Sequence, residues 1–286
     1  MRNNEKRVGQ SGTQRPEAPT AAVAAQQSQP LSFVTPTQFV ELPSKGELYP
    51  EGHPLHKQEV VEIKYMTAKE EDILTSEALL KQGLALERLM SNIILDKRID
   101  PESLLSGDRN AILIAARESA YSALYETKVT CPSCSHVADF TFSLEEKRIN
   151  LGCLDESLLK EKSVRVQDGV LYTMLPKSGV DVGFRLLTGQ DENELSNQSK
   201  QKKAKGQHSA VTDQLYKIIV SVNGNEDRFM VQQFIMSMPV SDSKLLRKLH
   251  RQMTPNVDLT QLYGCSKCGH TTDMEVPFNT EFFWPE

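Results

Sequence analysis

The sequence has little of what membrane-spanning or secreted proteins need. It contains one tryptophan in 286 residues, and aromatic residues make up 6% of it. Its apolar runs all fall short of the roughly 18–20 residues that cross a bilayer. No apolar signal-peptide core follows the start, Met1-Arg-Asn-Asn-Glu. We therefore expect no membrane span and synthesis in a reducing cytoplasm, where paired cysteines are more often metal ligands than disulfides.

Familiar catalytic patterns are missing too. The sequence has no Gly-x-Ser-x-Gly, no phosphate-binding glycine loop ending in Lys-Ser or Lys-Thr, and no His-Glu-x-x-His. Its net charge is -5 and its pI about 5.8, so there is no overall basic field to attract nucleic acid. We expect no enzyme. The chain is long enough for one large domain or two ordinary ones.

Residues 1–30 are rich in Gln, Ala, Ser, Thr and Pro and have almost no large apolar side chains. Such a segment cannot bury enough surface to offset the entropy lost on ordering. We predict a disordered N-terminal arm. It is either a solvated tail or an arm that orders on a neighbouring subunit.

Two short cysteine motifs give the strongest signal, Cys131-Pro-Ser-Cys134 and Cys265-Ser-Lys-Cys268. The C-x2-C spacing lets two thiolates bind one tetrahedral metal, and two such pairs complete a four-cysteine zinc site. Each motif has the form of a zinc-ribbon knuckle that leads into an alternating strand. Four thiolates leave no open coordination position, so the zinc would be structural. The predicted ligands are Cys131, Cys134, Cys265 and Cys268.

Two other interpretations of the motifs stay open. Each pair could bind its own metal with the nearby His136 or His270, or all four thiols could be free. With one shared site, these histidines would be surface groups or would lie outside the ligand shell. The fifth cysteine, Cys153, is expected to be a buried and inert thiol.

The chain also has the pattern of an internal duplication. Each cysteine pair follows an aspartate at the same distance, Asp108 in the first half and Asp242 in the second. The turn Leu42-Pro-Ser-Lys-Gly46 is echoed by Leu175-Pro-Lys-Ser-Gly179. We predict an α+β fold of two related lobes joined by the four-cysteine site. The lobes would span residues 31–155 and 156–286.

Local patterns place the main elements. Alternating apolar residues predict strands at 31–34, 38–42, 60–65, 137–142, 170–174, 182–187 and 272–276. Capping signals and helical periodicity predict helices at 67–73, 84–95, 108–124 and 212–222.

Three segments invite a functional interpretation beside a structural one. The acids Glu70, Glu71 and Asp72 cap a helix that begins at Thr67, or supply catalytic carboxylates. The basic run 200–205 is a solvated loop, or a patch for nucleic acid or an acidic partner. The aromatic stretch 278–284 covers the core, or anchors a partner.

Four stretches resemble the base plate hub proteins of T4-like contractile-tailed phages: Val40–Pro50, Val61–Thr75, Gly107–Ile112 and Thr127–Cys134. The resemblance covers residues 38–145 well, and the second half fits mainly through its cysteine pair. It implies a non-enzymatic component of the tail baseplate hub in the virion, made in the host cytoplasm. It also implies contacts with other tail proteins and allows a homo-oligomer within the hub. The alternatives are a transient zinc-dependent tail assembly chaperone and a nucleic-acid-binding zinc-ribbon protein.

Overall fold

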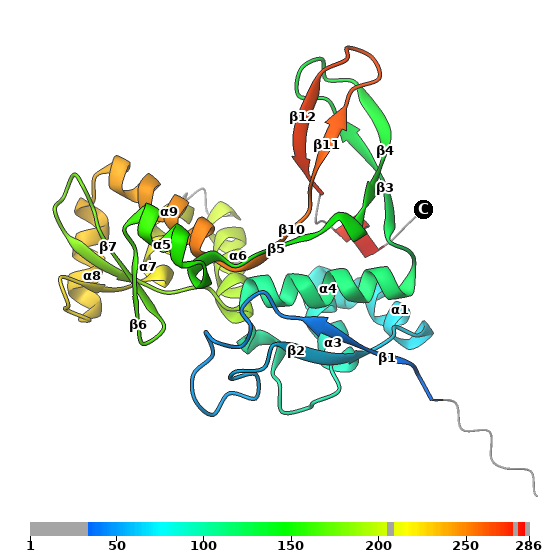
Figure 1. The fold of residues 1–286 in the computed structure, drawn as a ribbon, viewed down its shortest axis with the longest axis horizontal. Coiled ribbons are helices and arrows are strands. Elements are labelled where there is room, and N and C mark those ends of the chain that lie inside the picture. The colour runs from blue at the N-terminus through cyan, green and yellow to red at the C-terminus, as the bar shows by residue number, and fades with distance from the viewer. Residues whose placement is uncertain (1–33, 205–208, 277–279, 284–286) are drawn as a thin grey trace, which may run out of the picture. The chain divides into compact units, whose positions relative to one another are not determined.

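Helices alternate along the chain with short strands that pair antiparallel, in pairs and in one four-stranded sheet (Figure 1). This confirms the mixed helix and sheet composition expected from the sequence. The computed structural model describes residues 34–204, 209–276 and 280–283. The predicted arm 1–30, nearly all of the predicted strand 31–34, and Trp284 lie outside these ranges. Within them, no helix is both long and apolar enough to cross a membrane.

The strands are β1 (Thr37–Glu41), β2 (Val60–Lys64), β3 (Leu124–Thr130), β4 (Val137–Ser143), β5 (Arg148–Asn150), β6 (Arg165–Gln167), β7 (Val170–Met174), β8 (Asp181–Phe184), β9 (Ile219–Val222), β10 (Asn256–Asp258), β11 (Thr260–Gly264) and β12 (Thr271–Glu275). The α-helices are α1 (Ala68–Thr75), α2 (Glu77–Gln82), α3 (Ala85–Ile93), α4 (Ser106–Ala120), α5 (Glu156–Lys162), α6 (Gly189–Ala204), α7 (Ala210–Ile218), α8 (Arg228–Ser237) and α9 (Val240–Met253). Short 3-10 turns are η1 (Pro101–Ser103), η2 (Leu144–Glu146), η3 (Gly152–Leu154) and η4 (Thr280–Phe283).

In the first half, the pair β1–β2 packs against the buried helix α4. Ile112, Leu113 and Ile114 are all buried, as the apolar start of this helix predicts. The predicted bounds 108–124 are wrong at both ends. The helix begins at Ser106, because the extended backbone of Leu105 ends the preceding segment. It stops at Ala120 because the chain then enters β3.

In the second half, four antiparallel strands form a sheet in the order β6-β7-β8-β9. The predicted helix 212–222 is too long. It ends at Ile218, and the β-branched segment Ile219–Val222 pairs with β8 instead. The strand predicted at 182–187 is shorter, since β8 ends at Phe184.

The basic run is not a loop where the structure describes it. Helix α6 continues through this run to Ala204. The Lys202 ammonium lies 2.7 Å from the Asp213 carboxylate. The ion pair ties α6 to α7, so this lysine has a partner within the chain.

In each half an aspartate on a long helix, α4 or α9, accepts hydrogen bonds from a turn, and the two turns are similar in sequence. In the first half, Asp108 accepts hydrogen bonds from the Ser44 backbone N–H at 3.0 Å and from the Ser44 hydroxyl at 2.6 Å. In the second half, Asp242 accepts from the backbone N–H groups of Lys177 at 3.1 Å and Ser178 at 2.8 Å. Both aspartates are buried, and each is the third residue of its helix rather than its N-cap.

A second arrangement also occurs in both halves. The buried carboxylate of Glu70 accepts from the Thr67 backbone N–H at 3.0 Å and lies 2.8 Å from the Lys64 ammonium. In the second half, the buried carboxylate of Asp191 accepts from the Thr188 N–H at 3.1 Å and lies 2.7 Å from the Arg185 guanidinium. Each cation precedes a threonine by three residues, and each acid follows it by three.

Candidate metal centre

The first cysteine pair lies in the turn between β3 and β4. The Cys131 N–H donates to the His136 carbonyl at 2.8 Å, and the Ser135 N–H donates back to the Cys131 carbonyl at 2.9 Å. Ser135 adopts a positive φ of 55°, which closes the turn tightly. Full pairing of β3 with β4 from Leu124 to Ser143 fixes the base of this hairpin.

The second pair lies in the turn between β11 and β12, with the same hydrogen bonds. The Cys265 N–H donates to the His270 carbonyl at 2.9 Å, and the Gly269 N–H donates to the Cys265 carbonyl at 3.0 Å. Gly269 takes the positive-φ position, at 69°. The two knuckles therefore have the same backbone form, as predicted from their sequences.

The two hairpins bring all four sulfurs together. Cys131 Sγ lies 3.8 Å from Cys268 Sγ, and Cys134 Sγ lies 3.7 Å from Cys265 Sγ. All four ligand atoms lie within 4.8 Å of one another. A regular tetrahedron with metal–sulfur bonds of about 2.3 Å has sulfurs about 3.8 Å apart. These separations are far longer than the roughly 2.05 Å of a disulfide, so the thiols are free and fit one shared metal ion.

Backbone groups make the second knuckle favourable for a thiolate. N–H groups of Cys268 and Lys267 point at the Cys265 sulfur and, against desolvation, lower the pKa of that thiol to about 6. The pKa of Cys134 instead rises to about 12. A backbone N–H of His136 lowers it, but desolvation and the neighbouring thiols together outweigh that effect. Four thiolates this close repel one another, so full ionisation requires a cation among them.

Aromatic and amide contacts join the hairpins below the cysteines. The rings of Phe140 on β4 and Tyr263 on β11 meet edge to face, with centroids 5.2 Å apart. The Gln261 side chain accepts from the Ser143 N–H at 3.0 Å and donates to the Ser143 carbonyl at 2.6 Å. The amide thus pairs with β4 as a neighbouring strand would. The sequence gives no signal for this role, because Gln261 is simply a polar residue in an alternating strand.

Among the residues the structure describes, these cysteines form the one group of His, Cys, Asp or Glu side chains placed to hold a metal ion. His136 and His270 are not part of it. The four-sulfur group therefore favours one shared site over two sites with a histidine each. Cys153 is buried elsewhere, and burial raises the pKa of its thiol to about 11, as suits an inert core residue.

The acidic start of α1 is a capping structure. Beyond its backbone bond, Glu70 accepts from the Thr67 hydroxyl at 2.6 Å. Burial opposes ionisation, but hydrogen bonds from Lys64 and Thr67 outweigh it and lower the pKa of Glu70. Glu71 and Asp72 are exposed. The capping interpretation accounts for Glu70, which is held by its neighbours rather than presented in a pocket.

The C-terminal aromatic stretch contributes to the core. Phe282 and Phe283 are 0% and 1% exposed. The Phe282 ring meets Tyr125 edge to face at 5.2 Å, and the Arg117 Nε donates to the Phe282 carbonyl at 2.8 Å. The partner-anchor interpretation is therefore wrong for these two residues.

The four-cysteine group has the features of a closed structural site that joins distant parts of a chain. The chain matches the family described as T4 bacteriophage base plate protein over residues 35–284, and it belongs to that family. Membership implies a location in the phage tail and contacts with other tail proteins, and it suggests a structural role. No curated protein and no solved structure matches the chain.

Proposed function

We propose that this protein is a structural component of the hub of a phage tail baseplate, and that one zinc ion joins its two cysteine hairpins. The observation that carries the proposal is the meeting of sulfurs 131 and 137 positions apart in the chain. The proposed ligands are Cys131, Cys134, Cys265 and Cys268.

Zinc would supply a tetrahedral link between β3–β4 and β11–β12. In small domains a structural zinc contributes on the order of 10–16 kcal/mol of apparent binding free energy. The contacts made by Phe140 and Gln261 are small by comparison, so the metal would dominate the joining of the hairpins. A closed set of four thiolates leaves no position for a substrate, which suits a protein that holds partners in place.

The chain would consist of two related units. Three features support this: the matching knuckles, the matching contacts of Asp108 and Asp242, and the matching caps at Thr67 and Thr188. These features recur in the same order along the chain. The predicted division at about residue 155 places one of each in each unit.

One set of experiments can test both whether the protein is located in the tail and whether it stays there in the finished particle. Purified tails and intact particles would be analysed by quantitative mass spectrometry, and a gene deletion would be complemented with wild-type protein. We expect the chain at a fixed number of copies per particle, and no normal baseplates in the deletion. Presence in assembly intermediates alone would instead make the protein a tail assembly chaperone. Normal baseplates without the protein would contradict the hub role.

A further inference from the structure

The two halves of the chain meet through a short antiparallel bridge between residues that precede two helices. Leu105, before α4, pairs with Thr188, before α6. The Ser106 N–H donates to the Leu187 carbonyl at 3.2 Å, and the Gly189 N–H donates at 2.9 Å to the residue before Leu105. Each donor is the first residue of its helix, where the N–H has no partner within the helix. The bridge therefore satisfies two helix N-termini at once.

Each partner in this bridge has a counterpart in the other half. Counted from the buried acid of each repeated motif, Pro239 corresponds to Leu105 and Thr67 corresponds to Thr188. These counterparts do not form an isolated bridge within the described residues. Val240, next to Pro239, is 72% exposed, and Thr67 is also exposed. Each half has thus used one of its two bridging edges, while its other edge remains on the surface.

The exposed segments carry the hydrogen-bonding groups that such a bridge needs. Val240 and Ala68 are the first residues of α9 and α1, so their N–H groups point out of the helices. The carbonyls of Met238 and Met66 correspond to those of Leu104 and Leu187, which accept the two hydrogen bonds of the bridge within the chain. No backbone hydrogen bond outside the helices uses any of these four groups in the part of the chain that the structure describes. Pro239 lacks an N–H, but the bridge draws its donors from the flanking residues.

We propose that residues 238–240 of one copy of this chain pair with residues 66–68 of a second copy, repeating between chains the bridge that joins the halves of one chain. The inference rests on the two-unit organisation proposed above. The two surfaces are different, so the contact is head to tail. Such contacts build rings if the rotation closes and filaments if it does not.

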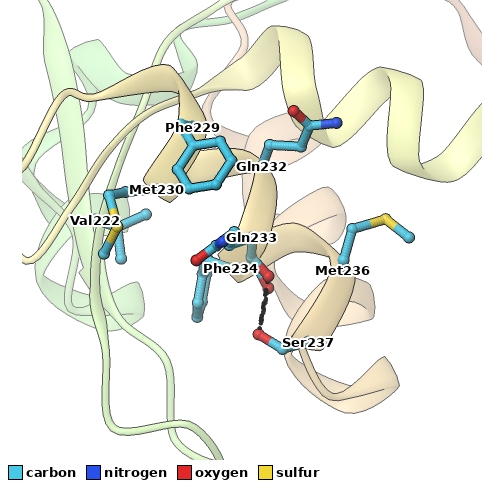
Figure 2. Close-up of a pocket in the computed structure, with 8 residues that line it drawn as sticks. All are labelled: Val222, Phe229, Met230, Gln232, Gln233, Phe234, Met236 and Ser237. Carbon is cyan, nitrogen blue, oxygen red and sulfur yellow. Dashed lines mark hydrogen bonds between the residues drawn. The ribbon is translucent and has the colours of Figure 1, made fainter.

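The apolar surface beside residues 238–240 supports binding of a second copy of the chain at this place. Figure 2 shows the groove on α8, with Phe229 and Met236 along it. These side chains are 62% and 75% exposed. In the bridge within the chain, η1 precedes α4 and contacts α6. Helix α8 occupies the same place before α9, so α1 of the second copy would cover the groove.

Charge also favours a second copy. The stretch Phe229–Ser241, which buries Val231 and Ile235 and exposes Phe229 and Met236, has no ionisable side chain, so ion pairs can form only at its margins. In the bridge within the chain, Arg109 lies 3.7 Å from Glu192. By the same count Glu192 corresponds to Glu71, which is exposed on α1, and Arg109 corresponds to Ser243, whose neighbour Lys244 is exposed. A second copy would therefore bring Glu71 to the start of α9, where this chain exposes Lys244.

The sharpest variant is Ala68→Pro, which removes the N–H that the bridge would use. Proline is well tolerated at the first position of a helix, and the preceding Thr67 has the extended backbone, with φ -120° and ψ 174°, that proline requires. The matched control is Glu156→Pro, at the exposed first position of α5 after the extended Asp155. Both variants should keep the melting temperature of wild type.

A second pair of variants tests the surface itself. Val240→Glu places an acid at the start of α9, where the helix dipole favours it, but opposite the acids of α1 in the second copy. The control Val211→Glu makes the same change near the start of α7, on a side chain that is also exposed. Sedimentation equilibrium of the full-length chain would be measured up to about 100 µM, since interfaces of standard size have Kd values of micromolar or lower.

We expect the average mass of wild type to rise above 32.1 kDa with concentration. Ala68→Pro and Val240→Glu should each weaken association about tenfold or more, and the controls should leave it unchanged. A wild-type mass that stays at the monomer value, or association that both variants leave intact, would overturn the proposal. A photo-crosslinker at Val240 that reaches another tail protein instead of residues 66–72 would also overturn it. The hub role is unaffected by these outcomes, because it is tested by the presence of wild type in tails.

Discussion

The side chain of Arg117 on α4 donates a hydrogen bond to the backbone carbonyl of Phe282 at 2.8 Å, which fixes the C-terminal turn η4 on the core. The same guanidinium lies over the ring of Tyr125, with its carbon 5.8 Å from the ring centroid. Residues from the middle of the described chain and from its C-terminal end thereby share one buried cluster. The C-terminal segment is part of the fold of the first half.

Phe282→Ala should reduce the free energy of unfolding by about 3–5 kcal/mol, because a fully buried ring leaves a cavity. The matched control is Phe39→Ala, since Phe39 is 69% exposed and its loss should change stability by less than about 0.5 kcal/mol. Urea unfolding followed by circular dichroism would measure both. Equal effects for the two variants would show that η4 is not part of the core.

Tyr49→Phe should reduce the free energy of unfolding by about 1–3 kcal/mol, because it leaves the Leu105 N–H without this partner and removes one hydrogen bond from the buried Asp108 carboxylate. The Tyr49 hydroxyl donates to the Asp108 carboxylate at 2.7 Å and accepts from the Leu105 N–H at 3.0 Å. Tyr216→Phe, on a partly exposed ring, should have almost no effect. Chemical denaturation of the two variants side by side would test this, and a neutral Tyr49→Phe would mean that the hydroxyl is dispensable.

Stability should fall as the pH is lowered from 7 to 5, in part through His250. Burial lowers the pKa of His250 from 6.5 to about 4. The unfolded chain therefore takes up a proton near pH 6.5, while the folded chain stays neutral until about pH 4, so acid favours unfolding. The contribution is about 2 kcal/mol over this range.

His250→Gln keeps a neutral polar side chain and should remove this contribution. The variant would be less stable than wild type at pH 7, but its free energy of unfolding should change less between pH 7 and pH 5. Denaturation curves at several pH values would give both slopes. Parallel slopes would show that another group causes the acid sensitivity.

Sequence patterns located the knuckles well, because C-x2-C turns and alternating strands are local features. The capping at Thr67 was also predictable, since Glu70 lies three residues away in the chain. Boundaries were less accurate where distant contacts decide the outcome. Residues Ile219–Val222 follow a helix but become β9, because β8 offers a strand to pair with.

The roles of Gln261 and Phe282 could not be found from the sequence. Gln261 acts by pairing with a backbone segment more than a hundred residues away, and nothing in its own neighbourhood marks it. The aromatic stretch near the C-terminus predicted burial and partner binding equally. The fold decides between them for Phe282, because α4 and β3 supply the pocket in which its ring packs.

The most direct test of the account is the zinc content of the purified full-length chain, measured by elemental analysis alongside Cys265→Ser and the control Cys153→Ser. We predict about one zinc per chain in wild type and in Cys153→Ser, and its loss in Cys265→Ser together with a lower melting temperature. Cys131→Ser should behave like Cys265→Ser, because each contributes one ligand to the same ion. Two zinc ions per chain, none at all, or a full complement in Cys265→Ser would contradict the shared site.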